Sequence, residues 1–143
     1  MQPVKVTDKL SVAGQPALDD VAAIAKAGYG TLINNRPDGE EAGQPGAAAE
    51  ADAAARAGLD YLDLPVTGAT ISKEDVRRFQ EAVDHADGPV LAHCRTGTRS
   101  LTLWVLGEVM DGRMAPEAVR GFGAAHGIDL SGAVAWLERH AHG

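Results

Sequence analysis

The stretch that decides the fold is Val90-Leu91-Ala92-His93-Cys94-Arg95-Thr96-Gly97-Thr98-Arg99-Ser100-Leu101. Residues 89–93 form a short apolar run that predicts a buried strand, and residues 100–110 are apolar nearly all round, which predicts a buried helix. A polar loop joins the two segments. Gly97 allows this loop to bend sharply, because glycine has no Cβ to clash. A strand that leads through one cysteine and a short loop into a buried helix is typical of an α/β domain.

The rest of the chain repeats this alternation of strands and helices. Strands are predicted at 10–14, 31–35 and 61–66; helices are predicted from Pro16 to Gly28, at 46–57, from Ser72 to Gly88, at 115–125 and at 130–140. Ser72 and Asp75 resemble a capping box at the start of the helix that follows them. Right-handed crossovers then predict an α/β fold, a single domain over residues 1–143 with a mainly parallel central sheet flanked by helices.

Composition and charge narrow the possible functions. The chain has 143 residues, a net charge of −7 and no basic run, which argues against binding nucleic acid or an anionic membrane. A membrane-spanning helix needs about 20 apolar residues, and no apolar run in this sequence is nearly that long. No signal peptide is visible either, so a cytoplasmic protein is expected. A single cysteine excludes an intramolecular disulfide and a multi-cysteine zinc site. His126, His140 and His142 lack ligand spacing, so neither a metal nor a cofactor is predicted.

Cys94 is the candidate nucleophile. The loop after it can turn backbone N–H groups inward to form an anion-binding nest, and the positive end of the next helix dipole adds to that field. Arg99 and Arg95 supply cations, and this setting favours the thiolate form of Cys94. The anion-binding candidates in the loop are Arg95, Thr96, Gly97, Thr98 and Ser100, the last two as hydroxyl donors to the sulfur or to a bound anion. The alternative is that Cys94 is a core residue at a strand end and that the arginines are only solvated.

A second group of candidates, Asn34, Asn35 and Arg36, lies at the end of the predicted strand at 31–35. This strand should lie beside the Cys94 strand. Two interpretations stay open for this group: a pocket rim, with Arg36 best placed to contact an anion, or a structural turn bent by Pro37. Asp38, Glu40 and Glu41 either pair with the loop arginines or solvate the loop. His93 should point away from Cys94 by strand alternation, as a hydrogen-bonding support rather than a base. The supporting residues are therefore His93, Asn34, Asn35 and Asp38.

These motifs resemble known families. The Cys-x4-Arg loop of residues 94–99, followed by Ser100, is similar to the active-site loop of rhodanese-type sulfurtransferases. The wider pattern resembles a bacterial family of small tyrosine-phosphatase-like proteins, which also occurs as a domain of beta-lactamase-hydrolase-like proteins. That resemblance rests on residues 11–16, 31–40, 44–45, 64–66 and the Cys94 loop, and it covers roughly residues 4–110. It implies a dual-specificity-phosphatase-like fold.

The sequence departs from the phosphatase signature in two ways. The active-site loop of tyrosine and dual-specificity phosphatases is similar to His-Cys-x5-Arg, whereas only four residues separate Cys94 from Arg99. The shorter loop forms a tighter bowl, which suits the single terminal sulfur of a persulfide. The phosphatases also use an aspartic acid to protonate an alkoxide leaving group, but residues 67–70 contain no carboxylate, and neither Asp38 nor Asp63 matches its position. Sulfite or a thiolate leaves without that proton.

The leading hypothesis is therefore a cysteine-dependent sulfurtransferase. Cys94 would take sulfane sulfur from thiosulfate or a persulfide, hold it on the N–H groups of residues 95–99 beside Arg99 and Arg95, and pass it to a thiol acceptor such as glutathione. The first alternative is a phosphoester hydrolase with a phosphocysteine intermediate. The second is a non-catalytic module that binds an anion or a partner. The resemblance also hints at a separate persulfide-oxidising partner enzyme.

Overall fold

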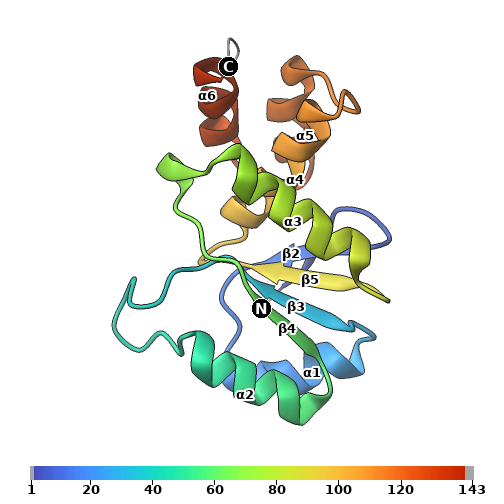
Figure 1. The fold of residues 1–143 in the computed structure, drawn as a ribbon, viewed down its shortest axis with the longest axis vertical. Helices are drawn as coiled ribbons and strands as arrows, with labels where there is room; N and C mark the ends of the chain where they lie inside the picture. The colour runs from blue at the N-terminus through green and yellow to red at the C-terminus, as the bar shows by residue number, and fades with distance from the viewer. Residues whose placement is uncertain (1, 141–143) are drawn as a thin grey trace.

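A five-stranded sheet lies at the centre of the computed structural model, which describes residues 2–140 (Figure 1). The strand order is β1 (Val4–Lys5), β2 (Leu10–Ala13), β5 (Val90–His93), β3 (Thr31–Asn34) and β4 (Asp60–Asp63). Only β1 runs antiparallel to its neighbour; the other pairs are parallel. This confirms the predicted mainly parallel sheet. β1 escaped prediction because two residues carry no periodicity.

The register places β5 in the middle of the sheet. Ala92 lies between Val12 of β2 and Ile33 of β3, and every residue of these three strands is buried. Burial on both faces is what parallel strands require. Cys94 therefore leaves the sheet at the centre of its carboxyl edge, where ligands bind in open α/β sheets.

Helices cover both faces of the sheet (Figure 1). On one face lie α1 (Val21–Lys26), preceded by the short 3₁₀ helix η1 (Leu18–Asp20), and α2 (Ala47–Ala57). On the other lie α3 (Lys73–His85) and α4 (Thr98–Met110), with α5 (Val119–Ala125) and α6 (Ser131–Arg139) stacked beyond them; η2 (Gly68–Thr70) and η3 (Pro116–Ala118) are 3₁₀ turns. Each face has its own apolar core, and the larger one includes Phe79, Leu106 and Trp136.

Local sequence signals explain the start of α3 and the end of α2. Ser72 caps α3 by accepting from the Asp75 amide at 3.0 Å, and the Asp75 carboxylate accepts from the Ser72 amide in return, as the capping box predicts. α2 ends at Gly58, whose φ of 79° is left-handed. α4 starts at Thr98 rather than Ser100, and it is buried as predicted. Among residues 2–140, no helix is long and apolar enough to cross a bilayer.

Two predicted elements differ from the structure. The helix expected from Pro16 is divided into η1 and α1, and it ends near Gly28 as expected. The strand expected at 61–66 covers only Asp60–Asp63. Pro65 has no N–H to donate to a ladder, so pairing ends before it.

Candidate active site

Cys94 lies directly after β5, and its side chain is fully buried. Its amide donates to the carbonyl of Ala13 at 3.3 Å, which ties the start of the loop to the end of β2. The loop then passes close to the chain after β2, because a Cβ on Gly14 would come within 3.0 Å of the Arg95 carbonyl oxygen. Gly14 therefore allows the two segments to touch.

The Cys94 sulfur receives a backbone hydrogen bond from its own loop. The Gly97 amide donates to Sγ at 3.0 Å. Gly97 is the N-cap of α4 and adopts a left-handed φ of 94°. Residues that carry a Cβ rarely adopt this conformation, whereas glycine does so readily. Of the amides of residues 95–99 that were expected around the sulfur, this is the one for which the structure shows a contact. The N-terminus of α4 adds its positive dipole end at the same place.

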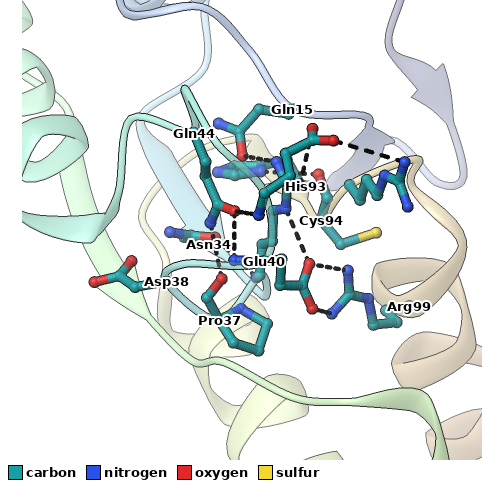
Figure 2. Close-up of polar contacts among 12 residues, drawn as sticks. Gln15, Asn34, Pro37, Asp38, Glu40, Gln44, His93, Cys94 and Arg99 are labelled. Atoms are coloured by element: carbon teal, nitrogen blue, oxygen red, sulfur yellow. Dashed lines mark hydrogen bonds and ion pairs between the residues drawn. The ribbon is translucent and has the colours of Figure 1, made fainter.

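Arg99 projects from the first turn of α4 and is held by Glu40 (Figure 2). Both Glu40 carboxylate oxygens accept from the Arg99 guanidinium at 2.8 Å, and Nη1 also donates to the Val66 carbonyl at 3.0 Å. The hydrogen bond from Arg99 is the main cause that lowers the pKa of Glu40 to about 2. The same bond raises the pKa of Arg99. Both groups therefore carry full charge at neutral pH.

Arg36 and Arg95 have carboxylate partners from the same turn. The Arg36 side chain is only 1% exposed; it donates to Glu40 at 3.0 Å, to Glu41 at 3.2 Å and to Gln15 at 3.1 Å. The expectation that Arg36 contacts a substrate anion is thus not supported by its contacts, because a buried guanidinium needs these acceptors itself. Arg95 is 63% exposed and lies 3.7 Å from Glu41.

The loop hydroxyls divide between surface and core. Thr96 and Thr98 lie at the surface with their hydroxyl oxygens 3.3 Å apart. Ser100 is fully buried, and its hydroxyl donates to Asn35 Oδ1 at 2.8 Å. In this structure the one proton of Ser100 is engaged with Asn35, so the role of Ser100 as a donor to the sulfur or to an anion stays a prediction.

The asparagines after β3 form a structural turn. Asn34 accepts from the Arg36 amide at 2.8 Å and donates to the Tyr61 hydroxyl at 2.9 Å. Asn35 donates to the Leu64 carbonyl at 2.9 Å. Of the two interpretations left open by the sequence, the structure supports the turn.

Asp38 has a different partner from the one considered. Its carboxylate accepts from the Ala47 amide at 2.8 Å, at the first residue of α2, and Figure 2 shows it apart from Arg99. Gln44 closes the same loop by donating to the Pro37 carbonyl at 2.8 Å. Glu40 and Glu41, rather than Asp38, pair with the arginines.

A buried polar cluster behind Cys94 was not predicted. Glu50 of α2 is 1% exposed; its oxygens lie 2.7 Å from His93 Nε2, 3.2 Å from the Tyr61 hydroxyl and 2.6 Å from Gln15 Nε2. His93 Nδ1 lies 3.2 Å from the Cys94 carbonyl oxygen, so His93 supports the backbone as expected and does not face the sulfur. Glu50 lies four residues before the buried Ala54, and this spacing on the inward helix face is the signal that could have found it.

The described residues 2–140 contain no group of three His, Cys, Asp or Glu side chains arranged to hold a metal ion. His126 and His140 each bond a backbone carbonyl of their own helix at 2.8 Å, Phe122 and Trp136 respectively. His142 lies outside the described residues.

Comparison with known proteins places this geometry in context. Residues 4–111 match the family described as beta-lactamase hydrolase-like protein, phosphatase-like domain. A beta-lactamase hydrolase-like protein of Agrobacterium fabrum is 48% identical over 99% of this chain, and the chain spans about a third (33%) of that relative's length. A putative phosphatase from Neisseria meningitidis is 34% identical and covers 95% of this chain and 96% of its own, with a TM-score of 0.85.

A more distant structure, that of Tk-PTP, shares the fold at 18% identity, with a TM-score of 0.71 over 98% of this chain and 96% of its own. These neighbours confirm the expected phosphatase-like α/β fold. The rhodanese-like character of the loop stays a prediction.

Proposed function

We propose that this chain, which belongs to the family of beta-lactamase hydrolase-like phosphatase-like domains, uses Cys94 as a nucleophile that moves sulfane sulfur from an anionic donor to a thiol. The donor class is thiosulfate or a low-molecular-weight persulfide, and glutathione represents the acceptor class. Phosphoester hydrolysis through a phosphocysteine is the second candidate, and the phosphatase-like relatives favour it.

The state of the carboxylate beside Arg99 carries the preference for sulfur transfer. A phosphoester hydrolase must give a proton to an alkoxide leaving group, so it needs a protonated acid near the nucleophile. Glu40 is the carboxylate bound to Arg99, and a pKa of about 2 keeps it ionised at neutral pH. Residues 67–70, where the acid loop of tyrosine phosphatases would fall, contain no carboxylate.

Sulfur transfer needs no such acid. The Cys94 thiolate attacks the outer sulfur of thiosulfate, a new S–S bond forms at Sγ, and the old S–S bond breaks with its electron pair leaving on sulfite. In the second half, an acceptor thiolate attacks the outer sulfur of the Cys94 persulfide and releases the enzyme thiolate. Sulfite and thiolates are stable anions at neutral pH, so neither half requires protonation of the leaving group. The Gly97 amide, 3.0 Å from Sγ, and the dipole of α4 stabilise negative charge on the sulfur.

Mass analysis of the intact protein tests this proposal. After incubation with thiosulfate or glutathione persulfide, Cys94 should gain one sulfur atom, and glutathione should remove it. Cys94→Ser should form no adduct. In parallel, both proteins are assayed with para-nitrophenyl phosphate.

Three outcomes separate the candidates. An adduct without phosphate release supports sulfur transfer. The absence of an adduct with every sulfane donor, together with phosphate release that Cys94→Ser abolishes, overturns it in favour of the hydrolase. Anion binding that survives Cys94→Ser, with no chemistry on any donor, overturns both and indicates a binding module.

A further inference from the structure

Two neighbouring glutamates compensate the arginines around Cys94. Glu40 bonds Arg99 twice at 2.8 Å and Arg36 once at 3.0 Å. Glu41 lies 3.2 Å from Arg36 and 3.7 Å from Arg95. The three arginines and two glutamates of this cluster together carry a net charge of +1.

Glu40 also takes up hydrogen-bond donors on the arginine that was expected to bind the substrate. Arg99 donates through Nη1 to Glu40 and to the Val66 carbonyl, and through Nη2 to Glu40 again. The Arg99 side chain is 16% exposed and that of Glu40 is 27% exposed, so the pair lies at the boundary between the loop and solvent. An incoming anion therefore meets a carboxylate already bound to the guanidinium.

We propose that Glu40 is a specificity-determining residue, which directs the site toward donors with one negative charge at the reacting end and against dianions. The favoured donor class is a low-molecular-weight persulfide; the disfavoured class includes thiosulfate and phosphate monoesters. The physical reason is that Coulomb energy scales with the product of the charges, so the Glu40 carboxylate offsets the attraction of the paired arginines by twice as much for a dianion as for a monoanion at the same distance. This inference rests on the proposed sulfur transfer and names its donor.

The persulfide step balances without another reactant. The Cys94 thiolate attacks the outer sulfur of a persulfide anion R–S–S⁻; the bond from Sγ to that sulfur forms, the S–S bond of the donor breaks, and R–S⁻ leaves with the electron pair. The products are the Cys94 persulfide anion and a thiolate. Two negative charges enter the step, one on Cys94 and one on the donor, and two remain after it, so no oxidant or reductant is consumed.

Anion protection of Cys94 tests the charge selectivity without any turnover. Alkylation of Cys94 by neutral iodoacetamide is measured at constant ionic strength with increasing sulfate, a dianion, or nitrate, a monoanion. Removing one carboxylate charge with Glu40→Gln should improve protection by nitrate about tenfold and protection by sulfate about a hundredfold, because the effect on the logarithm of the affinity doubles with the anion charge. Glu117→Gln is the matched control, since Glu117 is exposed in η3 and has no role at the site.

Sulfur loading then ties this selectivity to the donor. Glu40→Gln should shift the ratio of loading rates with thiosulfate and glutathione persulfide toward thiosulfate by about tenfold. Glu40→Asp, which keeps the charge, should retain the wild-type ratio, and Glu117→Gln should leave it unchanged. The role of Glu40 is overturned if the wild-type protein loads sulfur but Glu40→Gln improves protection by sulfate and by nitrate equally. It is also overturned if Glu40→Gln leaves the ratio of loading rates unchanged. Failure of every donor to load overturns the proposed function instead, while the sulfate and nitrate data still report on Glu40.

Discussion

Replacing Glu50 with alanine should destabilise the fold far more than a surface glutamate would. Glu50 is 1% exposed and accepts from three groups, of which His93 is fully buried. In Glu50→Ala, His93 Nε2 loses its partner at 2.7 Å in a place that water does not reach. Tyr61 and Gln15 are only part-buried, so both can turn toward solvent and recover part of their loss.

The expected size follows from these contacts. An orphaned buried donor costs about 1–3 kcal/mol, and a hydrogen bond to a charged group contributes about 1.5–3 kcal/mol. With one donor fully orphaned and two partly rescued, Glu50→Ala should lower the free energy of unfolding by about 3–5 kcal/mol. Glu50→Gln keeps one acceptor oxygen and should lose less, about 1–3 kcal/mol.

Urea unfolding of the two variants and of a control measures these losses. Asp52→Ala is the control: Asp52 lies in the same helix and its pair with Arg56 is 2.9 Å long, but both side chains are more than half exposed (63% and 80%). Exposed pairs contribute little, so this variant should stay within about 0.5 kcal/mol of wild type. A Glu50→Ala loss below about 1 kcal/mol, or one equal to that of Asp52→Ala, would refute the reasoning that His93 depends on Glu50.

Three further predictions concern the loop and its partners. Ser100→Ala should cost about 1–2 kcal/mol in unfolding free energy, because Asn35 loses a buried donor, while the rate of Cys94 alkylation stays near wild type; a large rate change would restore the expected role at the sulfur. Gly97→Ala should cost about 1–2 kcal/mol from its φ of 94° and a Cβ only 3.4 Å from the Ala13 backbone, and its melting temperature should fall accordingly. The Glu40 carboxylate, with its pKa lowered from 4.5 to about 2, stabilises the fold fully above pH 4.5, and this contribution is lost as the pH falls through 2. The difference in unfolding free energy between wild type and Glu40→Gln should therefore shrink over that range; a difference that is constant from pH 6 to 2 contradicts the ion pair.

The fold was accessible from the sequence because its signals are local. The buried strand before Cys94, the apolar helix after it, the capping box at Ser72 and the glycine stop at Gly58 all act within a few residues, and each is observed. Where local signals are weak, the predicted boundary differs from the observed one. The helix expected from residue 100 starts two residues earlier, at Thr98, because Gly97 is its N-cap.

The site was only partly accessible, because its contacts join segments far apart in the chain. Cys94 at the strand end and the support from His93 follow from strand order and alternation. The pairing of Glu40 with Arg99 spans 59 positions, and that of Glu50 with His93 spans 43. No periodicity encodes such distances, so the sequence offered Glu40 only as one of several acids and did not distinguish Glu50 within an alanine-rich helix.

The carboxyl groups near this edge of the sheet divide in a way that bears on the chemistry. Glu40 contacts Arg99 and has a lowered pKa, whereas burial, the charge of Asp38 and other neighbours raise the pKa of Asp63. Asp63 is thus the better proton donor by its pKa, but none of the described contacts joins it to Cys94; it lines a cavity with Leu64 and Val66. The acid beside Arg99 lacks a proton, and the acid with the raised pKa has no described contact with the nucleophile. A leaving group that departs as a stable anion suits this division, and sulfite and thiolates are such groups.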